Sequence, residues 1–573
     1  MSIDTTTPST RNTLPPAETP GGLDRRSFLG LGAAAAAGAI AAGCAEPPAA
    51  ESPAAPAVAA SGPADYVDGE TVETALGRLR GSRRGPVHAF RGIPYGAPTG
   101  GATRFLPASA PAPWTDVRDA TRIGHRAPQT QARLVHEWGV LYRLEASSED
   151  CLRLNVWSRG LGDGGKRPVM VWLHGGGFSG GSSGGYVYDG TNLAEQHDVV
   201  FVGVNHRLNV FGFLYLPEIG GEQYAQASNV GMLDIVLALQ WVRDNIERFG
   251  GDPSNVTILG QSGGGSKVST LLGMPDAKGL FHRAIAQSGS QVRSQTPEQA
   301  TRTARNVLAA LNLGPSQLDA LQQVPFYVLR DTLSETAGVG GFSPVMDGRT
   351  LPAHNFDPVA TEISADVPLM IGSTETEVTW NTGQNYDELD AEALRHYVRS
   401  ALRSDDATAD RITALYRGSR PEAGNLDLFL QIATDASNFR RGTGLQAERK
   451  AALGRAPVFK YYFNYYSPVR EGALRSMHCM DIPFALHNTD VAAPVIGAGP
   501  DVKALEAKMS AAWVAFARSG DPSHAGMPAW TPFTPSGRDT MVLNADPQLV
   551  ADHKGEHLRA VNEVMDAVEA RRG

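Results

Sequence analysis

Short apolar runs recur along the chain and are separated by stretches with a different spacing of apolar residues. Residues 169–173, 199–204 and 256–259 are rich in Val, Ile and Leu and almost continuously apolar. Such runs are typical of strands that are buried on both faces of a sheet. Further runs of this kind occur at residues 284–286, 368–372 and 458–463.

The intervening stretches carry the three-to-four-residue spacing of apolar positions that predicts amphipathic helices. Strands that alternate with helices predict an α/β fold with a large, mostly parallel sheet flanked by helices. We expect a helical insertion, in the manner of a lid or cap, within residues 388–416. The predicted helices cover residues 232–249, 266–272, 297–311, 388–416 and 502–518.

The first 64 residues have the features of an export signal followed by a linker. Arg25 and Arg26 precede an apolar run at residues 29–42, which is too short to span a bilayer. The paired arginines resemble a Tat export signal, and the sequence Ala-Ala-Gly-Cys ending at Cys44 resembles a bacterial lipobox. We therefore predict a signal segment over residues 1–44 with lipid attachment at Cys44, an Ala/Pro-rich linker over 45–64 and one folded domain over 65–573. A plain secretory signal with a coincidental cysteine is the alternative.

Composition excludes several classes of function. A net charge of -9 and the lack of a basic stripe disfavour nucleic acid as a partner. Three cysteines cannot form a disulfide framework, and no Cys or His pairs recur at zinc-ligand intervals. The sequence thus predicts an enzyme-like domain that uses neither a metal nor a cofactor.

A Gly-x-Ser-x-Gly segment centred on Ser262 follows one predicted strand and precedes a predicted helix. This context places the serine on a sharp elbow, with its hydroxyl above the sheet. A five-residue pattern often occurs by chance or as a simple glycine-rich turn. The segment alone is therefore a weak signal.

A second glycine motif upstream makes the interpretation specific. The segment His-Gly-Gly-Gly-Phe at residues 174–178 follows the strand at 169–173 and matches the loop that completes the oxyanion hole of lipases and esterases. A phosphate-cradling loop is the alternative, but no Gly-Lys-Ser/Thr follows it. The two motifs in this order predict a serine hydrolase of the α/β-hydrolase fold.

The chain resembles the type-B carboxylesterase/cholinesterase family, and among its branches the bacterial para-nitrobenzyl-esterase-like one. The likeness begins with Glu-Asp-Cys-Leu at residues 149–152 and extends over nearly all of the body. Other matching segments are Asn-His-Arg-Leu at 205–208, Phe-Gly-Gly-Asp-Pro at 249–253 and Ala-Gln-Ser-Gly-Ser at 286–290.

The resemblance implies a complete catalytic triad and oxyanion hole. Ser262 falls on the family's nucleophile, and Gly176, Gly177 and Gly263 fall on its oxyanion donors. The family's acid matches Glu377, with Glu375 as the rival, and its histidine matches His478 rather than His487. Ser288 matches a buried second serine that would support the acid by a hydrogen bond, although a strand-end turn serine is an alternative.

Two departures from the family pattern bear on this expectation. Gln261 stands where many relatives carry glutamate, which suggests that an anionic group beside a cationic substrate is missing. The family's upstream cysteine partner for Cys151 has no counterpart, so Cys151 is predicted to be a free, buried thiol, and Cys479 is assigned to packing.

We therefore expect hydrolysis of a small carboxylic ester through an acyl-enzyme on Ser262, outside the cytoplasm and at a membrane if Cys44 is lipidated. A carbamate or amide hydrolase, which would use the same triad, is an alternative. A non-catalytic, adhesion-type member of the same fold is the other alternative, but such members lack the serine or the histidine.

Overall fold

The computed structural model of the chain describes residues 66–130, 136–139, 142–143, 145–336, 339–381 and 389–571. The predicted signal segment, Cys44 and the linker at 45–64 lie outside the described residues. The predicted folded domain begins at residue 65, one residue before the first described position.

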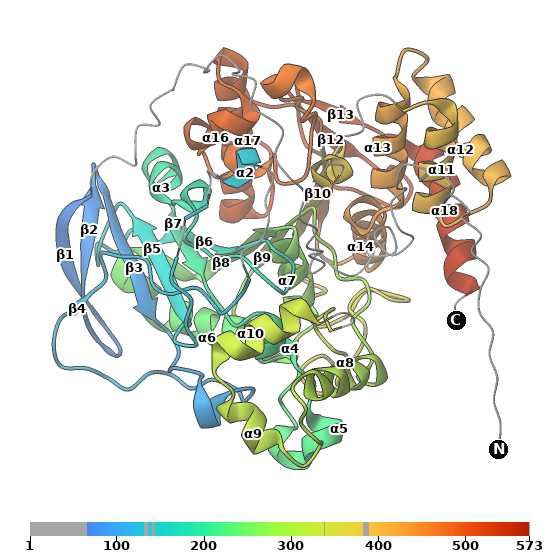
Figure 1. Cartoon of the computed structure of the whole chain (residues 1–573). Helices are drawn as coiled ribbons and strands as arrows, with labels where there is room; N and C mark the ends of the chain where they lie inside the picture. Colours follow the sequence, from blue (N-terminus) through green and yellow to red (C-terminus); the bar gives the residue numbers. More distant parts are fainter. Residues whose placement is uncertain are drawn as a thin grey trace, which may run out of the picture.

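One large mixed sheet forms the centre of the molecule (Figure 1). Its order is β1-β2-β3-β5-β7-β6-β8-β9-β10-β11-β12-β13, with the short β4 beside β2. The strands from β7 to β12 run parallel to one another, whereas β1, β2, β3 and β5 form an antiparallel edge. The strands are Val67–Thr74, Gly77–Arg84, Val87–Pro94, Arg118–Asp119, Arg153–Ser158, Arg167–Leu173, Val200–Val204, Gly251–Gln261, Arg283–Gln287, Leu369–Thr374, Val458–Phe463, Thr540–Leu543 and Gln548–Val550, numbered β1 to β13.

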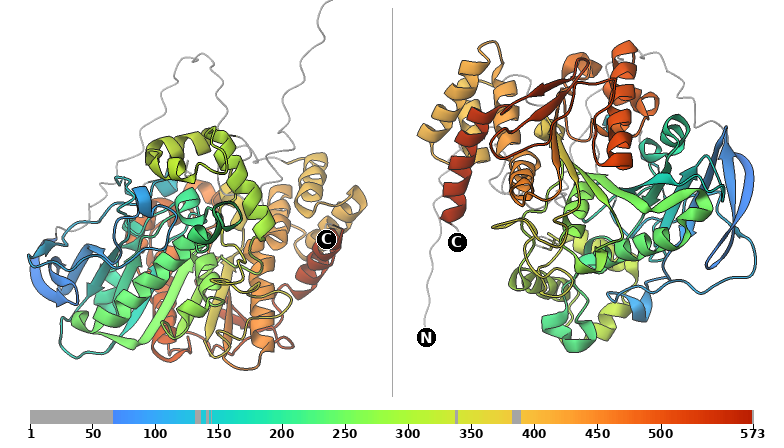
Figure 2. Two further views of the ribbon diagram at one scale, coloured as in Figure 1. Left: turned by 90° about the horizontal axis from the view of Figure 1, so that it is seen from below. Right: turned by 180° about the vertical axis from the view of Figure 1, so that it is seen from behind.

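Helices cover both faces of this sheet, as two further views show (Figure 2). The described helices from α2 to α10 are His136–Gly139, Thr191–His197, Asn209–Phe213, Pro217–Gly220, Val230–Asn245, Gly263–Leu271, Pro297–Ala310, Leu318–Gln323 and Phe326–Glu335. Those from α11 to α18 are Ala391–Leu402, Asp406–Ser419, Asn425–Ala436, Thr443–Ala452, Ile482–Ala485, Thr489–Ile496, Pro500–Ser519 and Gly555–Ala570.

Alternate side chains of the central strands enter different hydrophobic cores. Val171 of β6 packs into the core that includes α6, whereas the next residue, Trp172, packs into the core that includes α17. Side chains of a strand point alternately to opposite faces, so a strand between two helical layers must be apolar throughout. This explains the continuous apolar runs in the sequence.

The helical stretch predicted within residues 388–416 consists of two helices in the described part of the chain. α11 ends at Leu402 and α12 begins at Asp406, whose preceding residue Asp405 caps the new helix by accepting a hydrogen bond from the N–H of Thr408 at 2.8 Å. Together with α13 and α18 these helices enclose a separate small core, and they lie at the end of the sheet near β10 to β13 in Figure 1.

The strand register brings the segments of the predicted site together at the carboxyl-terminal ends of the parallel strands. Leu173 at the end of β6 pairs with Gly260 of β8, so the loop after β6 and the elbow after β8 begin side by side. β9 and β10 follow in the sheet, with Gln287 opposite Gly372. The carboxyl ends of parallel strands are where ligands bind in open α/β sheets.

Candidate active site

Ser262 occupies a strained turn between β8 and α7. Its backbone has φ 58° and ψ -124°, a conformation that residues with a side chain seldom adopt. The N–H of Ser262 donates to the carbonyl of Gln287 at 2.8 Å, and its own carbonyl accepts from the N–H of Ser266 at 3.0 Å. The elbow is thus held from β9 on one side and from the first turn of α7 on the other, as the sequence motif predicts.

The turn needs glycines because backbones pass very close to it. A Cβ atom at Gly264 would lie 1.9 Å from the carbonyl oxygen of Leu173, and one at Gly289 would lie 2.1 Å from the carbonyl oxygen of Ser262. Both contacts are with backbone, which cannot rotate away. The glycines therefore let α7 begin directly against the ends of β6 and β9.

The predicted oxyanion glycines lie together. Gly176 and Gly177 have φ of 89° and 61°, and a Cβ atom on Gly263 would lie 2.2 Å from the carbonyl oxygen of Gly177. Gly176 is exposed and Gly177 partly exposed, whereas the flanking Gly175 and Phe178 are buried. The loop after β6 and the start of α7 therefore form one backbone surface beside Ser262.

Hydrogen bonds from behind fix the peptide groups of this surface. The carbonyl of Gly175, which shares a peptide group with the N–H of Gly176, accepts from Nδ1 of His174 at 2.8 Å. The carbonyl of Gly176, which shares a peptide group with the N–H of Gly177, accepts from the N–H of Gly180 at 3.0 Å and of Ser179 at 3.3 Å. With their carbonyls held, the N–H groups keep a fixed direction, which is what stabilises an oxyanion effectively.

His478 and Glu377 are paired. Nδ1 of His478 lies 2.5 Å from Oε2 of Glu377, and Oε1 of Glu377 accepts the N–H of Thr374 at 2.7 Å. Both side chains are almost fully buried, at 5% and 0% exposure for the whole residues. The bond to the carboxylate fixes the proton on Nδ1 and leaves Nε2 as the basic nitrogen.

This pairing shifts both pKa values. Burial by itself would raise the pKa of Glu377, but the charge and hydrogen bond of His478 outweigh it and lower the pKa. Burial would likewise lower the pKa of His478, whereas Cys479 and Glu377 raise it well above its usual value. An imidazolium that is stabilised in this way is suited to hold a proton in mid-reaction.

The rival residues lie elsewhere. The Glu375 carboxylate is also buried, but it accepts from Arg420 at 2.6 Å and from Gln431 at 3.4 Å. Nδ1 of His487 lies 3.0 Å from the hydroxyl of Ser510 on α17. The geometry therefore favours Glu377 and His478 as partners over these two alternatives.

Ser288 lies behind the acid, at the end of β9. It is fully buried, and its hydroxyl has no partner of good hydrogen-bond geometry among the described residues. The hydroxyl is nonetheless close enough to Glu377 to contribute to the lowered pKa of that carboxyl group. Ser288 thus lies where the expected supporting role requires, but its hydroxyl forms no well-aligned hydrogen bond with Glu377.

Gln261 contacts the catalytic histidine predicted at position 478. It is fully buried, its Nε2 lies 3.3 Å from each ring nitrogen of His478, and its Oε1 accepts from Sγ of Cys479 at 3.2 Å. Position 261 therefore contacts the histidine directly, and the expected lack of an anionic group beside a cationic substrate stays a prediction. Cys151 is a free and buried thiol, as predicted, and Cys479 is free and partly buried.

Sequence reasoning missed two residues of a distant segment that contact the histidine and the end of β10 before the acid. Phe439 packs on the ring of His478 with centroids 4.3 Å apart. The neighbouring Arg440 donates to the carbonyl of Thr374 at 2.6 Å. No local signal marks this segment, because its role depends on how Asn438–Gly442 and α14 pack against β10.

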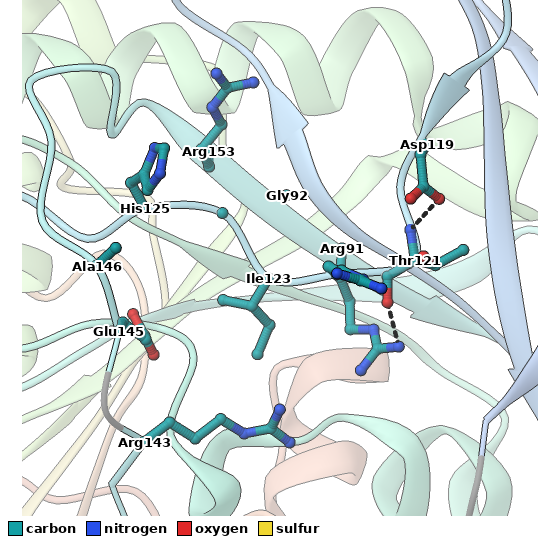
Figure 3. Close-up of a pocket in the computed structure, with 12 residues that line it drawn as sticks. Arg91, Gly92, Asp119, Thr121, Ile123, His125, Arg143, Glu145, Ala146 and Arg153 are labelled. Atoms are coloured by element: carbon teal, nitrogen blue, oxygen red, sulfur yellow. Dashed lines mark hydrogen bonds between the residues drawn. The ribbon is translucent and has the colours of Figure 1, made fainter.

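A cavity of about 700 Å3 lies away from the triad, along β3, β4 and β5 (Figure 3). Its walls carry both charge signs, and Arg91 donates to the carbonyl of Thr121 while Glu145 accepts from Ser182 at 2.5 Å. Because no predicted triad or oxyanion residue lines it, we assign it no part in the chemistry of Ser262.

Two further features bear on the class of site. The described residues contain no cluster of three or more His, Cys, Asp or Glu side chains that could hold a metal ion. None of the described helices is long and apolar enough to cross a membrane.

Comparison with known proteins decides the family. The sequence profile of the carboxylesterase family matches residues 68–561. The chain belongs to the carboxylesterase family.

Relatives and solved structures agree with this assignment. The chain is 34% identical to the para-nitrobenzyl esterase of Bacillus subtilis (strain 168), over 85% of this chain and 97% of the relative. It is also 34% identical to the phenmedipham hydrolase of Pseudarthrobacter oxydans, over 84% and 96%. A carboxylesterase structure from Geobacillus stearothermophilus superposes with a TM-score of 0.74 at 36% identity, over 86% of this chain and 99% of that one.

The predicted family, fold class and enzyme class are thereby confirmed. This carboxylesterase is an α/β-hydrolase with a large sheet and flanking helices, and it is a serine hydrolase of carboxylic esters. The alternative of a non-catalytic binding protein is not favoured.

Proposed function

We propose that this carboxylesterase hydrolyses its substrate through an acyl-enzyme on Ser262. His478 removes the hydroxyl proton while Oγ attacks the ester carbonyl, and Glu377 orients and stabilises the resulting imidazolium. The observation that carries this proposal is the 2.5 Å bond between His478 and Glu377, at the same sheet edge as the strained Ser262 elbow.

The negative charge of the tetrahedral intermediate then falls on the carbonyl oxygen. The N–H groups of Gly176, Gly177 and Gly263 are the donors that we assign to it. Two observations support them: their loops adjoin, and the carbonyls behind the first two N–H groups are already bonded. Such donors need no reorganisation when the charge develops.

Collapse of the intermediate breaks the bond to the alcohol oxygen, which takes the proton from His478. A water molecule then gives a proton to His478 and attacks the acyl-enzyme, and the second collapse returns that proton to Ser262. The products are one alcohol and one carboxylic acid, and no cofactor enters the cycle.

The central test replaces the nucleophile. With p-nitrophenyl esters of rising acyl length, we expect Ser262→Ala to lower kcat by at least about 10³-fold, because no other residue takes over a lost triad nucleophile. Ser266→Ala is the matched control, since Ser266 lies one turn further along α7 and its hydroxyl donates to the Ser290 carbonyl at 3.2 Å. Equal turnover by the wild type and Ser262→Ala would show that the nucleophile is wrongly assigned.

The names of the relatives suggest which esters to try first. A para-nitrobenzyl ester is one candidate, since a relative bears that name, and an esterase from Clostridium hathewayi with a TM-score of 0.75 is described as acting on aliphatic aromatic polyesters. An aryl carbamate belongs in the same panel, because the same triad would form a carbamoyl-enzyme. Faster turnover of the carbamate than of every ester would reverse the substrate preference that we propose.

We further propose that the enzyme is exported by a Tat-type signal and anchored by a lipid on Cys44. The support is the twin-arginine segment and the Ala-Ala-Gly-Cys sequence within residues 1–44. Cys44→Ala should release activity from the membrane fraction, whereas Arg25→Lys with Arg26→Lys should retain it in the cytoplasm. Membrane attachment that survives Cys44→Ala would contradict the anchor, and secretion of the wild type would favour the plain signal peptide.

A further inference from the structure

Lys267 is a buried lysine behind the oxyanion loop. It lies on α7, five residues after Ser262, and is fully buried. Its Nζ donates to the carbonyl of His174 at 2.8 Å, and this is the one hydrogen bond of that amine among the described residues. Its position links α7 to the loop that carries Gly176 and Gly177.

Among the described residues no carboxylate pairs with this lysine. Burial lowers the pKa of Lys267 to about 7, and no carboxylate offsets that effect. Removing a lysine from water without an acidic partner is costly, so such a residue is unusual unless it serves a purpose. The ring of Phe178 has its centroid 5.8 Å from Nζ.

The bond made by Lys267 joins the two halves of the oxyanion hole. One half is the loop after β6, which begins at His174 and presents Gly176 and Gly177. The other half is Gly263, the first residue of α7. Lys267 and Gly263 are four residues apart on that helix, so they share one face.

The backbones of these elements also come very close to one another. Cβ atoms at Gly263 and Gly264 would lie 2.2 Å from the Gly177 carbonyl oxygen and 1.9 Å from that of Leu173. Lys267 reaches past these glycines and bonds to the loop at its first residue. A change at this bond can therefore tilt the loop relative to α7.

His174 connects Lys267 to the peptide groups of the oxyanion loop. Its carbonyl accepts from Lys267, and its ring donates through Nδ1 to the carbonyl of Gly175. The ring stacks on His206 with centroids 5.1 Å apart and an angle of 15° between the planes. Burial, together with the charge of Lys267, holds the pKa of His174 well below its usual value, so the ring stays neutral with its proton on Nδ1.

We propose that Lys267 is a positioning residue for ester hydrolysis, which holds the loop at His174 so that the N–H groups of Gly176 and Gly177 face the oxyanion together with that of Gly263. This proposal rests on the proposed function of those three glycines. It concerns the transition state rather than substrate binding, because the donors strengthen as the charge develops.

The test is Lys267→Met, which keeps the volume of the side chain and removes the donor. We expect kcat to fall about 10- to 100-fold with KM changed less than about threefold, as for a misplaced oxyanion donor. Affinity for an aryl trifluoromethyl ketone, which forms a tetrahedral adduct with the serine, should fall by the same factor. Inhibition by the product alcohol should stay within about twofold, because it has no oxyanion.

Lys450→Met is the matched control. Lys450 is also buried, and its Nζ also donates to backbone carbonyls, those of Ser364 and Ala365, the latter at 2.8 Å. Burial lowers the pKa of Lys450 to about 8. We expect this variant to lower the thermal midpoint in the same way as Lys267→Met while leaving kcat and ketone affinity unchanged.

Several outcomes would overturn the proposal. A folded Lys267→Met with kcat within twofold of the wild type would do so, as would an equal loss of kcat in Lys450→Met. If Lys267→Met does not fold, Lys267→Arg and Lys267→Gln take its place, and a loss of kcat without a parallel loss of ketone affinity in these variants contradicts the proposal. Ser262→Ala, run in the same assays, separates this result from a failure of the proposed nucleophile, because it tests turnover with Lys267 intact.

Discussion

Both oxygens of the Glu377 carboxylate are occupied by donors. One accepts from His478 and the other from the N–H of Thr374. The imidazolium of His478 is therefore stabilised by a carboxylate that cannot turn away. Since the pKa of His478 is raised, the base form that the reaction needs appears only as the pH rises past the usual histidine range.

This arrangement predicts the pH dependence of Glu377→Gln. In the wild type kcat/KM should rise with pH through a midpoint above ~6.5, the ordinary value for histidine. A glutamine has one oxygen for two donors and no charge, so the midpoint should move down and kcat should fall about 10²- to 10⁴-fold. Steady-state kinetics between pH 5 and 9 measures both effects.

Glu375→Gln is the control for this experiment. Glu375 is an equally buried carboxylate two residues away, but its partner is Arg420, which is partly exposed and can turn to water. Its loss should leave the pH midpoint in place. A shifted midpoint in Glu375→Gln with none in Glu377→Gln would reverse the assignment of the acid.

At the scale of elements, the site depends on how closely α7 approaches β6. The first turn of α7 is glycine-rich, and the space at Gly264 is filled by the carbonyl of Leu173. The elbow before α7 and the oxyanion loop after β6 can then lie side by side. A side chain in this contact must push the two elements apart, which moves Gly263 away from Gly177.

Gly264→Ala should therefore lose both stability and activity. We expect the free energy of unfolding to fall by about 1–3 kcal/mol, as for an overpacked core, and kcat to fall with it. Urea unfolding and p-nitrophenyl ester turnover are the measurements. Gly444→Ala on α14 is the matched control, since a Cβ atom there meets nothing within 4 Å and alanine favours a helix. If both variants behave alike, close packing at Gly264 is not what requires glycine.

At the scale of the whole molecule, a buried ion pair joins α6 to the loop after β7. Asp234 accepts from the guanidinium of Arg207 at 2.6 and 2.8 Å and from its backbone N–H at 3.0 Å. Burial would lower the pKa of Arg207, but the charge of Asp234 raises it. Both side chains are withdrawn from water, at 2% and 0% exposure, so neither charge can be left alone.

Asp234→Ala should consequently destabilise the whole domain. Leaving Arg207 charged and buried is expected to lower the free energy of unfolding by about 3–5 kcal/mol. Asp410→Ala removes an ion pair with Arg395 in which both side chains are about half exposed, and it should change the same quantity by less than about 1 kcal/mol. Urea unfolding compares the two, and equal losses would show that burial does not set the cost.

The sequence by itself predicted most of the central sheet and the order of the site. Strands β6 to β11 were predicted correctly because short, continuously apolar runs are typical of strands buried on both faces of a sheet. Ser262 and the loop at 174–178 were predicted because glycine motifs indicate backbone positions where no side chain fits. The break between α11 and α12 was missed, since a capping aspartate within a polar helix is a weak signal. The signal segment and Cys44 remain predictions.

The tertiary structure decided what depends on contacts between distant segments. Glu375 and Glu377 are two residues apart in one loop, and only the packing of β10 against the His478 loop selects which carboxylate meets the histidine. The burial of Gln261 against His478 and the reach of Lys267 to the His174 carbonyl likewise have no local signature. Motifs fix local backbone geometry, whereas the direction and burial of a side chain are set by the neighbours that the fold supplies.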